Sequence, residues 1–245
     1  MNKEPKKSVN LAFVGLSKRG SGLLNIVLQS MDDVNVTAVC DVYEDRANSA
    51  ADAVMKKTSK RPFVTLDYKE LLDRKDIDAV IVPSSWETHF DICIDFMEAG
   101  KYAASEVGGA TSIDQCWQLV KTYERTKIPV MILENCCYGK TEMTVLNMVK
   151  QGVFGELIHA QGGYQHDLRA EVAMGRENRH YRLNNYLNRN GDLYPTHELG
   201  PISKWLSINR GNRMTYLCSM ASKSGGINEW IKAHKGHDFE NADRN

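Results

Sequence analysis

The chain has 245 residues with ordinary globular proportions, 42% hydrophobic and 25% charged. Lys plus Arg and Asp plus Glu number 31 each, so the formal net charge is zero. This balance excludes a strongly basic nucleic-acid binder, and no stretch approaches the roughly 20 apolar residues of a membrane helix. We therefore expect a soluble protein with no nucleic-acid and no membrane partner.

The cysteines and the N-terminus bear on the compartment. The six cysteines include no Cys-x-x-Cys pair and lie in apolar runs, which indicates reduced, buried thiols rather than a disulfide framework. Residues 1–7 are polar and rich in lysine, and no apolar h-region of a signal peptide follows them, so this chain shows no export signal. We expect a cytoplasmic location, or a periplasmic one if a twin-arginine signal was removed.

In the first half, short apolar runs alternate with helical patterns. The predicted strands are Val9–Val14, Val34–Cys40, Ala79–Val82, Tyr102–Ser105 and Val130–Leu133. The predicted helices are Ser21–Met31, Glu44–Lys57, His89–Ala99 and Ser112–Thr126, where apolar residues recur at three-to-four spacing. This alternation predicts a parallel sheet with right-handed crossovers.

The pattern changes after a helix at about Lys140–Gln151. Leu157–Gln165 and Met214–Met220 look like strands, and Pro201–Leu206 looks helical. The segment Arg169–Asn190 is polar with little periodicity. We therefore expect a second domain of α+β type, with an open mixed or antiparallel sheet.

A glycine-rich turn follows the first predicted strand, reading Gly15-Leu16-Ser17-Lys18-Arg19-Gly20-Ser21-Gly22, and leads into an apolar helix. The second strand ends in Asp41, 21 residues beyond Gly20. Such a turn delivers pyrophosphate to a helix N-terminus, and the acid accepts ribose hydroxyls. The layout predicts an α/β fold whose residues 1–150 form an N-terminal Rossmann dinucleotide-binding domain, followed by a substrate-binding domain at 151–245. Asp41 favours NAD over NADP because it would repel a 2′-phosphate.

Two further features accompany this turn. Ser17 replaces its middle glycine, and Arg19 is either a phosphate contact or a solvated arginine at the helix start. The loop Pro83–His89 follows the strand Ala79–Val82, and loops at this end of parallel strands line the ligand crevice. Trp86 and His89 are therefore placed to touch a nicotinamide ribose or a substrate.

The first half resembles the glucose–fructose oxidoreductase/inositol dehydrogenase/MocA superfamily. The resemblance rests on the Rossmann start, the Pro-x-x-x-x-x-His loop and the helix exit Ala99-Gly100-Lys101-Tyr102, which leads to Glu106. Most dehydrogenases of that superfamily read Glu-Lys-Pro there, and the lysine works on the substrate hydroxyl. This chain reads Glu106-Val107-Gly108-Gly109, so it lacks that lysine.

Three longer strings are more specific: Leu133–Tyr138, Gly162–Arg169 and Arg189–Pro201. They resemble glycoside hydrolase family 109, the NAD-dependent α-N-acetylgalactosaminidases. Glu198, within the last string, stands where some relatives have glycine. Members of that family continue well past this C-terminus, so the resemblance implies a C-terminally truncated second domain.

This resemblance implies NAD as the cofactor and a small-molecule or glycan-terminal sugar as the partner. Together with the glycine turn, it places the NAD contacts at Gly15, Arg19, Gly20, Asp41, Trp86, Glu87, Thr88, His89, Glu106, Val107, Asn135 and Tyr194. It places the sugar contacts at Tyr164, Arg182, Tyr194, Pro195, Thr196 and His197. A homo-oligomer is a further expectation from the superfamily.

The resemblance also implies a redox route to hydrolysis. NAD⁺ takes hydride from C3 of the sugar, the ketone acidifies the C2 proton, the aglycone is eliminated, water adds, and the hydride returns. His197 is the best candidate base because its ordinary pKa of about 6.5 allows proton exchange near neutral pH. Tyr164 and Tyr138 are the alternatives, and which base serves which carbon stays open.

The sequence allows other functions. No pair of carboxylates stands out that would flank a glycosidic bond about 5–10 Å apart, as in an ordinary glycosidase. The alternatives are a sugar dehydrogenase or oxidoreductase of the same superfamily and an inactive NAD-binding fragment or sensor. No metal is expected, because His166, Asp167, His180 and His197 match no zinc spacing.

Overall fold

A computed structural model describes residues 8–175, 177–189, 191–193 and 195–234. The chain divides into two compact units, Met1–Leu133 and Glu134–Asn245. The first unit thus ends earlier than residue 150. The expected helix at Lys140–Gln151 is present as α5 (Lys140–Lys150), and it belongs to the second unit.

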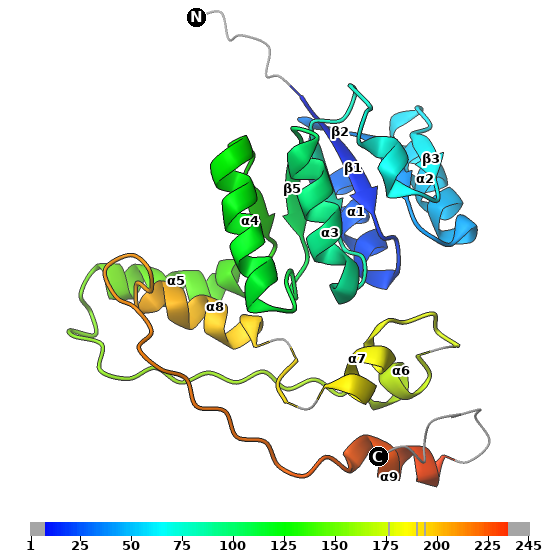
Figure 1. The fold of residues 1–245 in the computed structure, drawn as a ribbon. Helices are drawn as coiled ribbons and strands as arrows, with labels where there is room; N and C mark the ends of the chain where they lie inside the picture. The colour runs from blue at the N-terminus through cyan, green and yellow to red at the C-terminus, as the bar shows by residue number, and fades with distance from the viewer. Residues whose placement is uncertain (1–7, 176, 190, 194, 235–245) are drawn as a thin grey trace, which may run out of the picture. The chain divides into compact units, whose positions relative to one another are not determined.

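The first unit is built on a six-stranded sheet (Figure 1). Its strands are β1 (Val9–Val14), β2 (Val34–Cys40), β3 (Phe63–Thr65), β4 (Ala79–Val82), β5 (Tyr102–Ser105) and β6 (Val130–Ile132). The order is β3-β2-β1-β4-β5-β6, and every neighbouring pair is parallel. This is the strand order of the Rossmann fold, so the predicted dinucleotide-binding architecture is confirmed.

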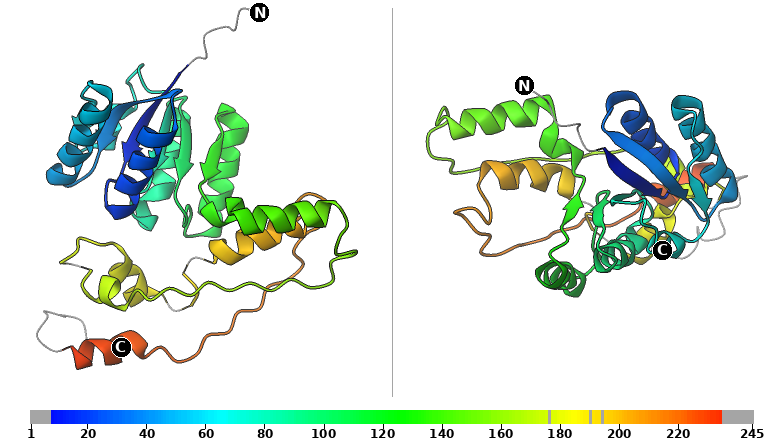
Figure 2. Two further views of the ribbon diagram at one scale, coloured as in Figure 1. Left: turned by 180° about the vertical axis from the view of Figure 1, so that it is seen from behind. Right: turned by 90° about the horizontal axis from the view of Figure 1, so that it is seen from above.

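Helices cover both faces of the sheet. They are α1 (Lys18–Ser30), α2 (Glu44–Thr58), α3 (Trp86–Glu98) and α4 (Ile113–Thr126), with a short 3₁₀ helix η1 (Tyr68–Leu71). The first two helices contact each other, as do the last two, and Figure 2 shows each pair side by side. The helix α3 begins at Trp86, three residues earlier than predicted, because Ser85 is its N-cap.

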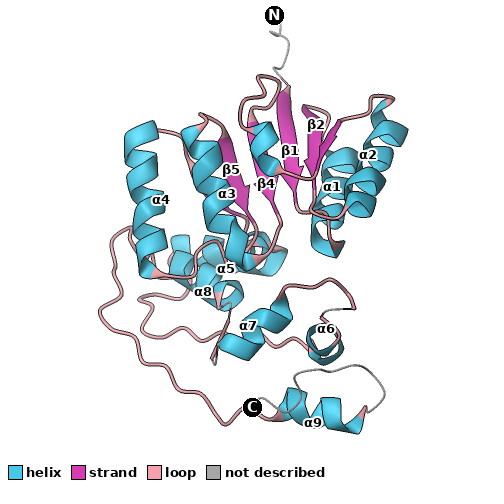
Figure 3. Cartoon of the chain, turned by 45° about the vertical axis from the view of Figure 1, so that its right-hand side comes forward, coloured by secondary structure: helices cyan, strands magenta, loops and turns pink. Residues whose placement is uncertain are grey.

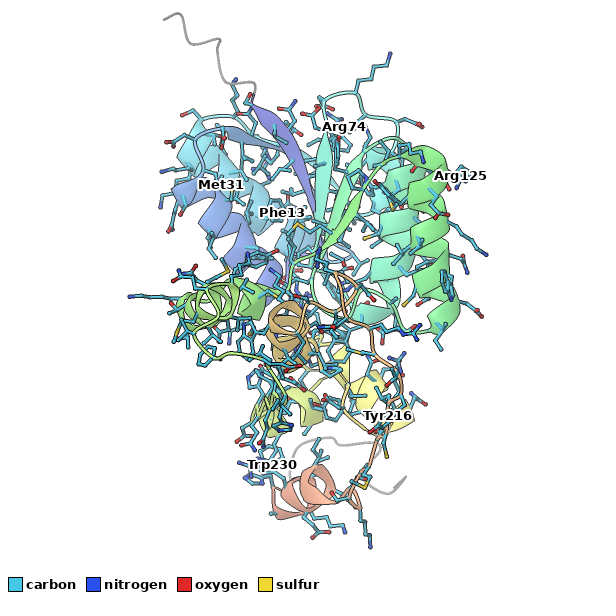
Figure 4. The ribbon with its side chains drawn as sticks, turned by 90° about the vertical axis from the view of Figure 1, so that its left-hand side faces the viewer. Phe13, Met31, Arg74, Arg125, Tyr216 and Trp230 are labelled. Atoms are coloured by element: carbon cyan, nitrogen blue, oxygen red, sulfur yellow. The ribbon has the colours of Figure 1, made fainter. Side chains whose placement is uncertain are left out.

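The core of this unit lies on both sides of β1, since successive side chains of a strand point to opposite faces. Leu11 and Phe13 pack into a cluster with residues of α1 and α2, whereas Ala12 and Val14 pack into a cluster with residues of α3. Phe13 is fully buried, and Figure 4 shows it inside the unit. Burial on both faces explains why β1 carries no polar alternation.

In the part of the second unit that the structure describes, short helices are joined by long loops (Figure 3). Besides α5 it contains η2 (Asn135–Tyr138), α6 (Arg169–Ala173), α7 (Arg182–Asn188), α8 (Thr196–Trp205) and α9 (Gly226–Ala233). The helix predicted at Pro201–Leu206 begins earlier than expected, at Thr196, and ends at Trp205.

The strands predicted at Leu157–Gln165 and Met214–Met220 are wrong: both segments run without secondary structure. A strand exists only where a neighbour accepts its backbone hydrogen bonds, and neither segment has such a neighbour among the described residues. Their apolar side chains stay in contact with solvent, with Ile158 93% and Tyr216 87% exposed. Figure 4 shows Tyr216 on its extended segment. The mixed or antiparallel sheet expected here is therefore absent from the described part of this unit.

The cysteines confirm the prediction only in part. All six are free thiols, and Cys40, Cys93 and Cys137 are buried. Burial raises the pKa of Cys40 and of Cys93 to about 12, so both stay protonated. Cys116 and Cys218 are exposed, because they lie on α4 and in the extended segment 214–220. None of the described helices has the length and the apolar character that crossing a membrane requires.

Candidate functional site

The turn between β1 and α1 has glycines where a side chain would collide with the backbone. Gly15 has a φ of +105°, and a Cβ there would lie 2.6 Å from the Cα of Ser84. A Cβ at Gly20 would strike the Gly15 carbonyl oxygen. Ser17 has a φ of −66°, so this position needs no glycine. The two glycines thus let the turn pack tightly as a cradle before the N-terminus of α1, where helix N–H groups attract an anion such as pyrophosphate.

Asp41 follows β2 and is held beside this cradle. Its Oδ2 accepts a hydrogen bond from the backbone N–H of Leu16 at 2.6 Å, and its Oδ1 accepts one from Tyr43 at 2.9 Å. An ionised carboxylate has roughly four acceptor positions, so two remain for further donors such as ribose hydroxyls. The side chain is buried, and its backbone partners fix its direction.

Arg19 and Glu106 form an ion pair at the carboxyl edge of the sheet. Nε and Nη2 of Arg19 lie 2.7 and 2.5 Å from Oε1 of Glu106, and Oε2 of the same carboxylate accepts from the N–H of Val107. Glu106 is buried, whereas about half of the Arg19 side chain is exposed. The phosphate contact expected of Arg19 therefore competes with this pair.

The loops after β4 and β5 interlock through Trp86. Its indole is buried, and a Cβ at Gly108, where φ is +98°, would collide with it. His89 is buried as well, and its Nε2–H donates to the carbonyl of Ser84 at 3.1 Å. Burial lowers the pKa of His89 to about 4. A neutral, fixed imidazole makes His89 part of the loop's framework rather than a proton carrier at neutral pH.

In the second unit, the buried Glu134 pairs with the partly buried His197. Oε1 of Glu134 accepts from the N–H of Cys136 at 2.9 Å, which caps η2, and lies 2.7 Å from Nδ1 of His197. Burial alone would raise the pKa of Glu134. The Thr196 hydroxyl, the His197 ring and the N–H of Cys136 lower it by more, so the pKa of Glu134 lies below its usual value. The ionised carboxylate only accepts, so Nδ1 of His197 donates and the lone pair of the neutral ring sits on Nε2.

Tyr164 lies against this pair. Its ring meets the His197 ring edge-on, with the centroids 4.6 Å apart and the planes at 74°. Its hydroxyl is 2.8 Å from Nδ1 of His166. The structure therefore brings together Tyr164 and His197, two of the three residues predicted to be catalytic.

The close approach of α8 to η2 positions His197. Gly200 lies in α8, and a Cβ there would be 2.8 Å from Sγ of Cys137 and 3.0 Å from Cγ of Glu134. The other end of α8 is fixed by Trp205, whose Nε1–H donates to the carbonyl of Glu142. The absence of a side chain at Gly200 lets the helix come near enough for His197 to reach Glu134.

Other predicted sugar and catalytic residues have different neighbours. Tyr138 is exposed, and the Lys204 ammonium lies 4.1 Å from the centre of its ring. Nη1 of Arg182 lies 3.0 Å from Oε1 of Glu171. If the Arg182 guanidinium binds a sugar, it does so while paired with this carboxylate. Tyr194 lies outside the described residues.

The remaining predicted positions lie at loop and helix ends. Asn135 opens η2, and Pro195 is the N-cap of α8, directly before Thr196. Glu87 and Thr88 lie in the first turn of α3, where the Thr88 hydroxyl donates to the carbonyl of Ser85.

The sequence analysis singles out Asn135 but misses Glu134. A signal was present, because Asp41, Glu106 and Glu134 each follow closely on the end of a strand of the parallel sheet. In a parallel sheet those ends line the ligand-binding edge. An acidic residue just after such a strand is therefore a candidate functional residue, even where no sequence motif marks it.

We predict that Gly200→Ala lowers the free energy of unfolding by about 1–3 kcal/mol, because the methyl group overpacks the contact with Cys137 and Glu134. Gly22→Ala is the matched control, since Gly22 also lies in a helix but has nothing within 4 Å of its added Cβ. This control should raise stability by about 0.5–1 kcal/mol. Denaturant unfolding measures both, and equal stabilisation by the two variants would contradict the packing described.

Comparison with known families agrees with this division. Residues 9–133 match the oxidoreductase family with an NAD-binding Rossmann fold, and residues 138–245 match the glycosyl hydrolase 109 C-terminal domain. Among solved structures, scyllo-inositol dehydrogenase from Lactobacillus casei, with bound NAD(H) and scyllo-inositol, is similar at a TM-score of 0.62 and 16% identity, covering 81% of this chain and 56% of that one. An NAD-binding protein from Listeria innocua is similar at a TM-score of 0.54 and 21% identity, covering 66% and 48%. These likenesses concern the fold.

Two curated relatives are closer in sequence. Glycosyl hydrolase family 109 protein 1 of Shewanella sp. strain ANA-3 is 42% identical over 237 residues, and a Shewanella oneidensis protein named alpha-N-acetylgalactosaminidase is 40% identical over 237 residues. Each alignment covers 95% of this chain and 51% of the relative, so the chain spans about half the length of these relatives. The chain belongs to glycosyl hydrolase family 109, with an N-terminal domain of the NAD-binding Rossmann-fold oxidoreductase family.

Proposed function

We propose that this protein is an NAD-dependent glycosidase that acts on α-linked N-acetylgalactosamine, as a small glycoside or at a glycan terminus. The observation that carries the proposal is the part-buried Glu134–His197 pair, in a chain that also has the glycine turn of a dinucleotide-binding domain. The relative named alpha-N-acetylgalactosaminidase supports the choice of substrate. NAD, when bound, supplies a transient hydride acceptor for the sugar and is regenerated, so the net reaction is hydrolysis.

The first unit offers what NAD requires. Gly15 and Gly20 allow a tight turn directly before α1, whose N-terminal N–H groups attract a pyrophosphate. Asp41 retains acceptor positions for two ribose hydroxyls, and its charge disfavours the 2′-phosphate of NADP. The tight glycine turn, the N–H donors of α1 and the charge of Asp41 thus all support NAD as the cofactor.

The second unit offers a base whose tautomer is fixed. With Nδ1–H of His197 donated to Glu134, Nε2 is the atom that takes a proton from the sugar. The imidazolium that forms is stabilised by the ionised carboxylate next to it. Tyr164 holds the ring from the side and adds a hydroxyl group nearby. Glu134 is accordingly a positioning residue for His197.

Val107 argues against an ordinary sugar dehydrogenase. It stands where dehydrogenases of the resembling superfamily carry the lysine that works on the substrate hydroxyl. Val107 is buried and apolar, and it exchanges no proton. Proton transfer in this chain must therefore come from other groups, and the Glu134–His197 pair meets that need.

The proposal is tested with a chromogenic α-N-acetylgalactosaminide, incubated with and without NAD⁺ while NADH absorbance is recorded. We expect aglycone release that requires NAD⁺ and yields no net NADH. His197→Ala should lower the rate at least about 100-fold, the usual contribution of a general base, while NAD affinity stays unchanged.

Three outcomes would overturn the proposal. Steady NADH formation from free sugar would show a dehydrogenase, and NAD binding without aglycone release would show that this chain has no glycosidase activity. Collapse of NAD binding in His197→Ala would show that His197 serves the cofactor rather than the sugar.

Asp41→Asn tests the cofactor assignment. Removing the charged acceptor should weaken NAD binding roughly tenfold or more, because hydrogen bonds to charged groups contribute about 1.5–3 kcal/mol each. NADP binding should weaken less, since a repulsion is relieved at the same time. Calorimetric titration measures both ligands, with Asp32→Asn at an exposed position as the control. An unchanged ratio of NAD to NADP affinity would show that Asp41 does not read the ribose.

A further inference from the structure

Three potential metal ligands converge beside η2. Glu134, Cys136 and His197 each offer one ligand atom, and these atoms all lie within 4.8 Å of one another. A carboxylate oxygen, a thiolate sulfur and an imidazole nitrogen are all zinc ligands. The sequence gives no zinc spacing here, because His197 reaches the other two only through the packing of α8 on η2.

A second observation points to a cation at this place. The Glu134 side chain is 9% exposed, and its Oε2 is buried without a hydrogen-bond partner among the described residues. The Thr196 hydroxyl is near enough to lower the pKa of Glu134, but it makes no hydrogen bond of good geometry to this oxygen. A buried carboxylate oxygen without a partner destabilises the fold, and a bound cation would satisfy it.

We propose that Glu134, Cys136 and His197 form a site for a thiophilic divalent cation, Zn²⁺, with water as the fourth ligand. Around a tetrahedral zinc ion the ligand atoms are about 3.3–3.8 Å apart, so the cluster needs only small side-chain rotations. Binding releases the thiol proton of Cys136 to solvent and uses a lone pair of the His197 ring.

The consequence for activity rests on the proposed function. Zinc would occupy the carboxylate and the imidazole that the glycosidase uses to move a proton, so Zn²⁺ inhibits the enzyme. Cys136 takes no part in that proton transfer, but it supplies the sulfur that makes the site selective for a thiophilic metal. Zinc sensitivity therefore depends on Cys136, whereas the basal reaction does not.

The test uses Co²⁺ as a spectroscopic probe for this site. We expect Co²⁺ to produce a thiolate-to-cobalt charge-transfer band, which Zn²⁺ removes by competition. Cys136→Ser should abolish the band and weaken Zn²⁺ binding by more than about tenfold, since even partners outside the ligand sphere contribute that much. Cys137→Ser and the exposed Cys116→Ser are the controls, and both should keep the band.

A band that persists in Cys136→Ser, or that Cys116→Ser also removes, would overturn the metal site. Circular dichroism identifies any variant that fails to fold. In that case the unmodified chain is treated with an alkylating reagent, and Zn²⁺ should protect Cys136; alkylation of Cys136 at the same rate with and without Zn²⁺ would overturn the metal site. In the glycosidase assay, Zn²⁺ should inhibit the unmodified chain and spare Cys136→Ser. A cobalt band without NAD-dependent aglycone release would refute the proposed function alone, whereas activity without any cobalt band would refute the metal site alone.

Discussion

The hydrogen bonds of the Glu134 carboxylate hold together the described part of the site in the second unit. One of its oxygens caps η2 through the N–H of Cys136 and holds His197 on α8. A hydrogen bond to a charged group contributes about 1.5–3 kcal/mol, and removing one partner of a buried pair costs more than the bond itself contributes. The same carboxylate therefore holds α8 against η2 and fixes the tautomer of His197, the proposed base.

The first unit uses the same physical device. Asp41 and Glu106 each follow a parallel strand, are buried, and accept backbone N–H groups that fix their direction. Carboxylates held in this way lose little entropy on binding a ligand, because they are ordered beforehand. The interlocked loops around Trp86 and Gly108 add rigidity to the same edge of the sheet.

The sequence predicts the first unit well because its signals are local. The bounds of β1 and β2 match the prediction, since runs buried on both faces are distinctive, whereas β3 has only three residues and carries no pattern. In the second unit, the segment Met214–Met220 reads as a strand but has no pairing partner in the described chain. The motif strings identify His197, and the place of Glu134 just after a strand marks it as a candidate, but the contact between the two depends on the packing of α8 on η2. The dinucleotide-binding turn can thus be predicted from the sequence, whereas the pairing of Glu134 with His197 can be seen only in the fold.

The most direct test of this account is a double-mutant cycle on Glu134→Gln and His197→Gln, with free energies of unfolding measured at neutral pH. Because the two side chains share a short charge-assisted hydrogen bond, the cycle should give a coupling free energy of about 1–3 kcal/mol. If the two single losses instead sum to the double loss within about 0.5 kcal/mol, Glu134 does not hold His197, and the assigned tautomer and base lose their support.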